Sequence, residues 1–286
     1  WLDRGLYPFE SRYLTVEGQR LHYIDEGQGP TILFLHANPL WSFTYREIIQ
    51  DLRRDFRCVA FDYPGFGLSA LNPDWTHSIA ANSGLVERFI ESLDLQDVIL
   101  YAHDVSCSIG LGVVSRRTER FRAAIVSNSF AWPIDAYPGV RRFVRVAASA
   151  PFGFLIRNFN MLINYMSRNV FFADGRKLTD AEIAAFKGPF KDRSRRRVQQ
   201  ELFRSILTSH EYLVDLETHL QQLPDFPVMI LFGDDDATYE AGWHTRFEQL
   251  FSVHRTVILE GGHHFPSEYD PQRIAASIRE WYASLD

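Results

Sequence analysis

The stretch LYAHDVSCSIG, residues 100–110, joins a run of apolar residues to a cluster of small residues, with Asp104 between them. This pattern predicts a buried strand that turns sharply into a helix, because a tight strand-to-helix turn leaves room only for small side chains near its apex. Ala102, Ser106 and Cys107 occupy these crowded positions. Such a turn lifts the apical side chain clear of the sheet and directs helix N–H groups toward it, which favours a negative charge there.

Eight short apolar runs have the length and composition of β-strands. They cover residues 12–17, 20–25, 31–36, 57–62, 97–102, 123–128, 227–232 and 255–260. The first two alternate apolar and polar residues, which is typical of antiparallel edge strands, whereas the later runs are continuously apolar, like buried parallel strands. Helical patterns lie between the parallel candidates, at residues 45–55 and 83–93. This alternation predicts an α/β fold with a doubly wound, mostly parallel sheet and helices on both faces.

One long segment interrupts the alternation of strands and helices. Residues 133–223 contain no convincing strand but several amphipathic segments, in one of which Thr179 is placed to cap a helix and Glu182 follows three residues later. We therefore expect a core domain formed by residues 1–132 and 224–286, with a helical cap domain, residues 133–223, inserted after the sixth strand. A cap in that place would cover the carboxyl ends of the strands, where ligands bind in open α/β sheets.

Composition and charge narrow the class of protein. The 286 residues are 46% hydrophobic and 14% aromatic, as in a packed globular enzyme. The net charge of -6 argues against nucleic-acid and anionic membrane partners, and the basic cluster at 191–200 is expected to be the exposed face of a helix. The absence of a long apolar run or export signal predicts a cytoplasmic protein. Cys58 and Cys107 are expected to be buried free thiols, and no spacing indicates a metal site.

Two further strand ends carry residues that suit catalysis. Asp104 by itself could be only the N-cap of the following helix. Asp236, however, lies in FGDDDAT (232–238) after the seventh run, and His264 lies in EGGHHFPSE (260–268) after the eighth. Because the carboxyl ends of parallel strands meet at one edge of a sheet, these three side chains are expected to converge in the order nucleophile, acid, base.

The stretch HANPLWSFTYR, residues 36–46, follows the third strand. In a fold of this kind the loop supplies a backbone N–H to an oxyanion hole, and Asn38 adds a side-chain amide donor. An isolated Asn-Pro pair usually marks a turn. The functional interpretation of Asn38 therefore depends on the three residues at the other strand ends.

These motifs, together with DYPGFGLS (62–69) and the opening segment 6–30, resemble the haloalkane dehalogenases of the α/β-hydrolase superfamily. The resemblance is greatest to the subfamily whose halide donor is an Asn. It covers the core, residues 1–132 and 224–286, and is weakest in the cap. It implies an eight-stranded α/β-hydrolase fold and a cofactor-independent hydrolase that converts a haloalkane and water into an alcohol and halide.

The resemblance also implies a role for each residue of the site. Asp104 would be the nucleophile that forms a covalent ester, His264 the base that activates water, and Asp236 the acid that orients His264. Asn38 would hold the leaving halide through its amide. The backbone N–H groups of Asn38 and Val105 would form the oxyanion hole. Neither a metal nor an organic cofactor is implied.

Val105 departs from the family pattern, which has at this position a Trp whose indole N–H is the second halide donor. Loss of one of two such donors would cost on the order of 10²-fold in rate. Trp41 and Trp132 are the alternative donors in the pocket, and Phe130 is expected to form an apolar wall. Ser106 likewise replaces a glycine that is usual in the family.

Three other hypotheses stay open. Val105 suits an Asp-nucleophile hydrolase of a strained cyclic ether or β-lactone, since the leaving alkoxide needs no halide donor. An epoxide would need a proton donor, and the cap offers Tyr137, Tyr165 and Tyr212. A serine esterase would use Ser106 or Ser108, beyond the apex of the turn, and a catalytically silent fold would only bind a small ligand. The expected partner is a small apolar organic molecule, and the sequence does not define the oligomeric state.

Overall fold

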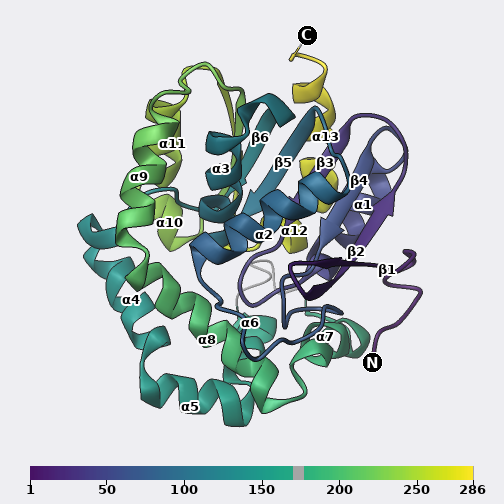
Figure 1. Ribbon diagram of the computed structural model, residues 1–286, viewed down its shortest axis with the longest axis vertical. Helices are drawn as coiled ribbons and strands as arrows, with labels where there is room; N and C mark the ends of the chain where they lie inside the picture. Colours follow the sequence, from purple (N-terminus) through teal and green to yellow (C-terminus); the bar gives the residue numbers. More distant parts are fainter. Residues whose placement is uncertain (170–176, 286) are drawn as a thin grey trace.

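The computed structural model describes residues 1–169 and 177–285, which form a central sheet with helices around it (Figure 1). In this described part of the chain the sheet has eight strands, in the order β1-β2-β4-β3-β5-β6-β7-β8. Their bounds are Arg12–Val16 (β1), Gln19–Glu26 (β2), Thr31–Leu35 (β3), Arg57–Phe61 (β4), Val98–His103 (β5), Phe121–Ser127 (β6), Val228–Gly233 (β7) and His254–Leu259 (β8). Each strand begins and ends within two residues of a predicted run, so the strand predictions are confirmed.

The direction of each strand follows its hydrophobic pattern. β1 pairs antiparallel with β2, and β2 pairs antiparallel with β4. The remaining pairs, from β4 with β3 to β7 with β8, are parallel. β3, β5 and β7 are buried along their whole length, because helices cover both faces of the sheet. The structure confirms the predicted mostly parallel sheet.

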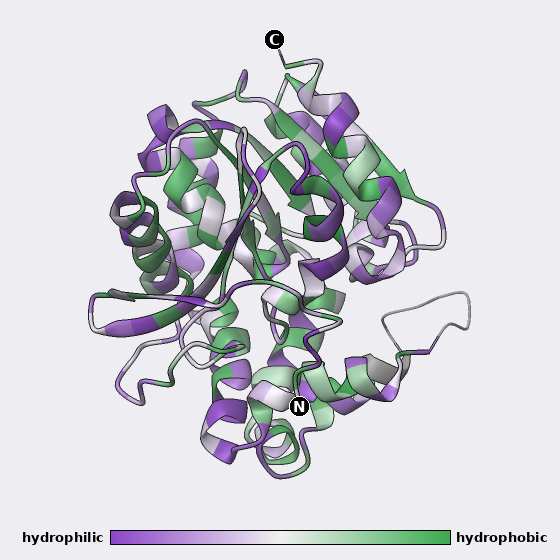
Figure 2. Ribbon diagram, turned by 90° about the vertical axis from the view of Figure 1, so that its right-hand side faces the viewer, coloured by the Kyte–Doolittle hydropathy of each residue, from purple (hydrophilic) through white to green (hydrophobic). Residues whose placement is uncertain are grey.

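Helices cover the two faces of the sheet. The core helices have the bounds Arg46–Leu52 (α1), Ile79–Ser92 (α2), Val105–Arg116 (α3), Ala237–Glu240 (α10), Trp243–Leu250 (α11), Pro266–Tyr269 (α12) and Pro271–Tyr282 (α13). α1 packs against α13, and α2 packs against α3. In Figure 1 the α2–α3 pair lies in front of the sheet and α13 lies behind it. Apolar residues dominate the strands, and polar residues gather on the outer turns of the helices (Figure 2).

The chain leaves the sheet between β6 and β7 and forms a helical insert. Its helices have the bounds Pro138–Ala148 (α4), Ala150–Phe159 (α5), Met161–Asn169 (α6), Asp180–Lys187 (α7), Arg193–Thr208 (α8) and His210–Leu220 (α9). α4 to α8 lie together at one end of the sheet and α9 packs beside α3 (Figure 1), which confirms the predicted insertion after the sixth strand. α7 begins with the expected capping box between Thr179 and Glu182. No helix among the described residues is long and apolar enough to cross a membrane.

A buried ion cluster fastens the insert to the core. Arg46, at the start of α1, donates to Glu182 of the insert at 2.8 Å and to Glu268 of α12 at 2.8 Å. The exposed fractions of these side chains are 2%, 6% and 1%, so water does not screen the charges. The cluster therefore ties the insert to the two core segments that follow β3 and β8.

The basic cluster at 191–200 is only in part the exposed helix face that its charges predict. Arg193 and Arg197 are exposed on the first turns of α8. Arg195 instead donates to the backbone carbonyl of Ser69 at 2.8 Å. Its guanidinium has exchanged water for carbonyl acceptors of the loop after β4, and this contact holds α8 against the core.

The two cysteines lie in separate parts of the core. Cys58 on β4 and Cys107 on α3 are buried free thiols, as predicted. Burial raises the pKa of the Cys107 thiol to about 12. Both side chains therefore act as small apolar groups in packing.

Candidate active site

Asp104 stands at the junction of β5 and α3. Its φ of 55° and ψ of -136° place a non-glycine residue in a strained conformation. Neighbouring backbone and side chains hold it there, because its N–H donates to the Ser127 carbonyl at 3.2 Å and its own carbonyl accepts the Ser129 hydroxyl at 2.6 Å. The carboxylate does not form a side-chain cap on α3, which argues against the simple N-cap interpretation.

Two backbone N–H groups reach the Asp104 carboxylate. The N–H of Asn38 donates to Oδ2 at 3.2 Å, and the N–H of Val105 also bonds to the carboxylate. Burial raises the pKa of Asp104, while the charge of His264 and these two hydrogen bonds oppose the rise. The predicted oxyanion donors and the predicted nucleophile thus lie together.

His264 lies between the carboxylates of Asp104 and Asp236. Its Nδ1 is 3.1 Å from Asp236 Oδ1, and its Nε2 is 3.9 Å from Asp104 Oδ1. Burial by itself would lower the pKa of His264, but the charge and hydrogen bond of Asp236 and the charge of Asp104 raise it to about 9. The side chains of His264 and Asp104 keep 25% and 20% of their surface exposed, so small molecules can reach them.

Asn128 and Thr238 hold the acid in place, although sequence analysis did not identify them. Asn128 Nδ2 donates to Asp236 Oδ2 at 2.8 Å, and the Thr238 hydroxyl donates to the same oxygen. Burial would raise the pKa of Asp236, but the charge of His264 and these hydrogen bonds lower it. Only their positions in the sequence could have indicated these roles, since Asn128 directly follows β6 and Thr238 lies two residues after the acid.

His103, directly before the nucleophile, supports the base and was also missed. Its Nε2 lies 2.7 Å from the backbone carbonyl of His264. Burial lowers the pKa of His103 to about 3, so the ring is neutral and donates its Nε2–H to that carbonyl. The residue therefore links the elbow of the nucleophile to the loop of the base.

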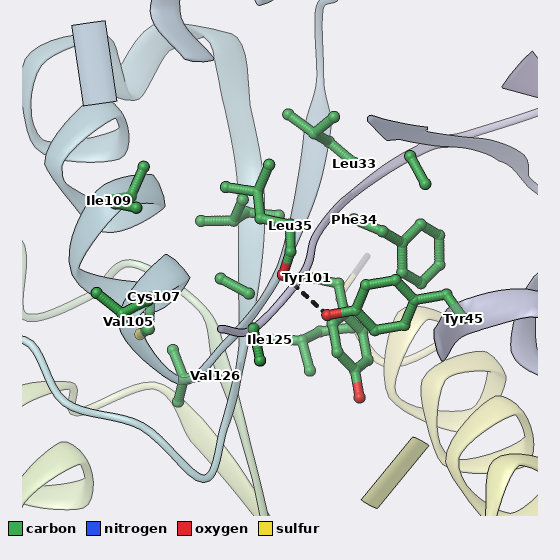
Figure 3. Close-up of a cluster of buried hydrophobic side chains, with 14 of the residues drawn as sticks. Leu33, Phe34, Leu35, Tyr45, Tyr101, Val105, Cys107, Ile109, Ile125 and Val126 are labelled. Carbon is green, nitrogen blue, oxygen red and sulfur yellow. Dashed lines mark hydrogen bonds between the residues drawn. The ribbon is translucent and has the colours of Figure 1, made fainter. Parts of the chain in front are cut away.

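The loop that carries Asn38 is held where it leaves β3. Tyr45 donates its hydroxyl to the carbonyl of Leu35, the last residue of β3, at 2.8 Å (Figure 3). Ser106 on α3 donates to the carbonyl of His36 and accepts a hydrogen bond from another hydroxyl of the core. Ser106 thus adds a bond between the elbow and this loop.

The hydroxyls required by the serine esterase hypothesis are engaged elsewhere. Ser106 donates to the backbone as described, and Ser108 donates to the Phe130 carbonyl at 2.6 Å. Both side chains are fully buried. Among the described residues neither hydroxyl bonds to an imidazole nitrogen, as an attacking serine would, and His264 lies against Asp104 and Asp236.

Neither Val105 nor Trp41 offers a free side-chain N–H beside the nucleophile. Val105 lies at the start of α3 among apolar groups that include Cys107 (Figure 3). Trp41 donates its indole N–H to the Ala185 carbonyl of the insert at 3.1 Å. This bond connects the insert to the core, and it uses the indole hydrogen that Trp41 would need to bind a halide.

Trp132 and Phe130 pack toward α11. The ring of Trp132 lies 4.7 Å from that of Phe247, and the ring of Phe130 lies 5.4 Å from that of Trp243, measured between centroids. Both side chains are buried. These contacts pack the two aromatic residues between the β6 loop and α11. The indole N–H of Trp132 has no hydrogen-bond partner among the described residues, and the assignment of both residues to the pocket stays a prediction.

The three tyrosines of the insert that could serve as proton donors have no described contact with Asp104. Tyr212 donates its hydroxyl to the Ser108 carbonyl at 3.1 Å. The Tyr137 hydroxyl accepts a hydrogen bond from Arg246 at 3.0 Å. Tyr165 is 59% exposed to solvent. The described contacts therefore give the epoxide hypothesis no proton donor directed at Asp104.

A separate cavity of about 450 Å³ lies between the start of the insert and helices α8 and α9. Asp104, His264, Asp236 and Asn38 do not line it. Arg141 and His210 line it, but both contact Asp135, at 3.1 and 2.9 Å. The single carboxylate of Asp135 thus serves both of these groups. In the described ranges, 1–169 and 177–285, no cluster of three or more His, Cys, Asp or Glu side chains could hold a metal ion.

Comparisons with known proteins agree with this geometry. Residues 30–271 match the family described as alpha/beta hydrolase fold. The chain is 33% identical to haloalkane dehalogenase 2 of Mycobacterium tuberculosis over 282 residues, 97% of this chain and 96% of that protein. It is 25% identical to the cis-3-alkyl-4-alkyloxetan-2-one decarboxylase of Shewanella oneidensis over 245 residues, 82% of this chain and 76% of that protein.

A solved structure shows the same fold. The haloalkane dehalogenase DbeA of Bradyrhizobium elkani superposes with a TM-score of 0.87, covers 97% of this chain and 98% of its own, and is 21% identical. The full-length similarity in sequence shows the family, and the similarity in structure shows the fold. The chain belongs to the haloalkane dehalogenase family of the α/β-hydrolase fold and is a haloalkane dehalogenase-like hydrolase.

Proposed function

We propose that Asp104 displaces the halide from a small halogenated alkane and forms a covalent ester. The two oxygens of its carboxylate have different neighbours, because Oδ2 accepts the Asn38 N–H at 3.2 Å and Oδ1 lies 3.9 Å from His264 Nε2. Oδ1 is the oxygen that attacks the sp³ carbon, in line with the carbon–halogen bond. The new C–O bond forms as the C–X bond breaks, and the electron pair of that bond leaves with the halide.

Water then hydrolyses the ester. It attacks the carbonyl carbon of the esterified Asp104 while His264 Nε2 takes its proton. The backbone N–H groups of Asn38 and Val105 stabilise the oxyanion that develops on Oδ2. Collapse of the tetrahedral intermediate expels the alkoxide, which takes the remaining proton of the added water and leaves as the alcohol, so the Asp104 carboxylate is restored. Asp236 stabilises the imidazolium until His264 returns its proton to solvent.

We assign residues 133–223 as a cap domain over a core formed by residues 1–132 and 224–286. The support is a contact beside the nucleophile, where Asn38 Nδ2 donates to the backbone carbonyl of Gln199 on α8 at 3.0 Å. The insert therefore meets the core at the loop that carries the oxyanion donor. In this arrangement the packing of the cap sets the size of the substrate.

The observation that carries this proposal is the position of His264, within reach of both Asp104 and Asp236. Incubation with 1-bromohexane should release bromide, and Asp104→Asn should release none above background. In His264→Phe the ester should accumulate, and intact-mass spectrometry should show a protein heavier by one hexyl group. Absence of both bromide release and adduct would exclude the mechanism.

A β-lactone is the second candidate substrate. Val105 provides no side-chain donor for a halide, and one relative is named for a reaction on an alkylated oxetan-2-one. An assay of 3,4-dialkyl-oxetan-2-ones beside 1-bromohexane separates the two candidates. Faster turnover of the lactone, with loss of that turnover in Asp104→Asn, would favour the second.

A further inference from the structure

Gln199 lies on α8 with its side chain fully buried. Neither Nε2 nor Oε1 of its carboxamide has a hydrogen-bond partner within the part of the chain that the structure describes. Buried amides are nearly always bonded, because loss of their bonds to water is otherwise uncompensated. An amide left in this state in a folded enzyme is a candidate for contact with a ligand.

The backbone of Gln199 contacts the loop that binds the nucleophile. Its backbone carbonyl accepts the side-chain amide of Asn38 at 3.0 Å, and the backbone N–H of Asn38 donates to Asp104 Oδ2 at 3.2 Å. Asn38 Oδ1 is also buried and has no partner among the described residues. Two residues in direct contact, one from the core and one from the insert, thus each keep unused hydrogen-bonding capacity in a buried carboxamide, and one of them binds the nucleophile through its backbone N–H.

The next residue on the helix shows the contrast. Gln200 is also fully buried, but its Nε2 donates to the carbonyls of Ala148 and Ser149 at 3.1 and 2.6 Å. Its Oε1 accepts from Arg157 at 2.7 Å. Gln200 is therefore a structural bridge between insert helices, whereas Gln199 has the same side chain and burial without such bonds.

A departing halide needs hydrogen-bond donors. The buried indole N–H of Trp132 also has no partner among the described residues, but its ring packs against Phe247 of α11, whereas Gln199 contacts Asn38 directly. Asn38 uses one of its two amide hydrogens on the Gln199 carbonyl and keeps the other. Val105 has no side-chain donor, and the Trp41 indole N–H is used by Ala185. We propose that Gln199 donates a side-chain N–H to the leaving halide, together with Asn38, in place of the Trp that its family carries after the nucleophile.

This inference rests on the proposed dehalogenation. The two hydrogen bonds stabilise the negative charge that develops as the C–X bond breaks, and no proton is transferred. A chloride, which is the poorer leaving group, depends on them more than a bromide. The donor comes from the insert, so cleavage of the carbon–halogen bond depends on the packing of α8 against the core.

The test compares Gln199→Leu with Gln200→Leu in the full chain. Gln199→Leu should slow bromide release from 1-bromohexane by about 10- to 100-fold, lower the ratio of 1-chlorohexane to 1-bromohexane rates, and weaken inhibition by added bromide. Its melting temperature should be unchanged or higher, because an unpaired buried amide is removed. Gln200→Leu should have a lower melting temperature and a rate within threefold of wild type.

Adding Val105→Trp to Gln199→Leu should restore part of the lost rate, since an indole donor then replaces the amide. Equal rates in Gln199→Leu and Gln200→Leu would overturn the inference. Formation of the hexyl ester in His264→Phe tells whether Gln199 has no role or whether the proposed dehalogenation itself does not occur. If that ester forms, and forms equally fast in His264→Phe/Gln199→Leu, only the role of Gln199 is wrong. If it never forms, the proposed mechanism itself is wrong.

Discussion

The Nδ1 atom of His264 lies 3.1 Å from Oδ1 of Asp236. Burial by itself would lower the pKa of the imidazole and raise that of the carboxyl, but the attraction between the two groups reverses both shifts. The pair is thus most stable as imidazolium and carboxylate. This preference suits a base that must accept a proton from water, and it leads to the first two predictions.

Asp236→Asn should stop the second half of the reaction and spare the first. Without the carboxylate the imidazolium loses its stabilising charge, so ester hydrolysis should fall by roughly 10³- to 10⁴-fold. Rapid-quench assays should show a burst of about one bromide per enzyme, followed by little turnover. Asp235→Asn is the matched control, because Asp235 is adjacent and 64% exposed. Its turnover should be within twofold of wild type, and an equal loss in both variants would contradict the assignment of the acid.

Asp104→Asn should lower the pKa of His264 below its value of about 9. A nearby negative charge favours the protonated imidazole, so removal of that charge favours the neutral form. Esterification of Asp104 removes the same charge, which frees His264 to act as a base at lower pH. NMR titration of the imidazole signals in both proteins measures the shift. An unchanged or higher pKa in the variant would show that Asp104 does not act on His264.

Asn128→Leu should loosen Asp236, since the amide donates to its Oδ2 at 2.8 Å. We expect kcat to fall by roughly tenfold or more, because a misplaced acid orients the base poorly, while KM changes little. The pKa of Asp236 should rise as one of its stabilising hydrogen bonds disappears. NMR titration of the Asp236 carboxyl measures this shift. A proportional loss of folded protein, without a change in this pKa, would indicate a structural role alone.

Ser106→Ala should cost stability and leave catalysis nearly intact. The hydroxyl joins α3 to the His36 carbonyl, and its loss leaves that buried carbonyl without this donor. We expect a loss of about 1 kcal/mol, or roughly 2–4 °C in melting temperature for a chain of this size. Calorimetry measures the loss of stability, and bromide release measures the rate of catalysis. A rate reduced by several orders of magnitude would revive the serine esterase hypothesis.

Arg46→Leu should destabilise the attachment of the insert strongly. The change leaves the buried carboxylates of Glu182 and Glu268 without their shared cation. Breaking such a buried pair costs about 3–5 kcal/mol. Arg53→Leu is the control, because its guanidinium is 37% exposed and pairs with Glu26, so its loss should cost less than about 1 kcal/mol. Urea unfolding of both variants measures the difference, and equal losses would argue against the bridging role.

Several parts of the candidate site could be predicted because they depend on the order of the strands. Asp104, Asp236 and His264 each follow a parallel strand, and parallel strands present their carboxyl ends at one edge. The capping box at Thr179 was predictable because it involves residues three positions apart. The basic cluster at 191–200 was only partly predictable, since Arg195 has its acceptor Ser69 in a distant loop.

The sequence by itself determined the eight strands, the helical insert, the elbow and the three residues of the proposed triad, because these features follow from hydrophobic period and local turn geometry. Tertiary structure decided which distant side chains support them. Asn128 meets Asp236 across 108 positions, and Asn38 meets Gln199 across 161. The physical reason is that such pairs leave no periodic signal. Only the packing of the insert on the core shows that the amide of Gln199 is buried without a partner while that of Gln200 is bonded.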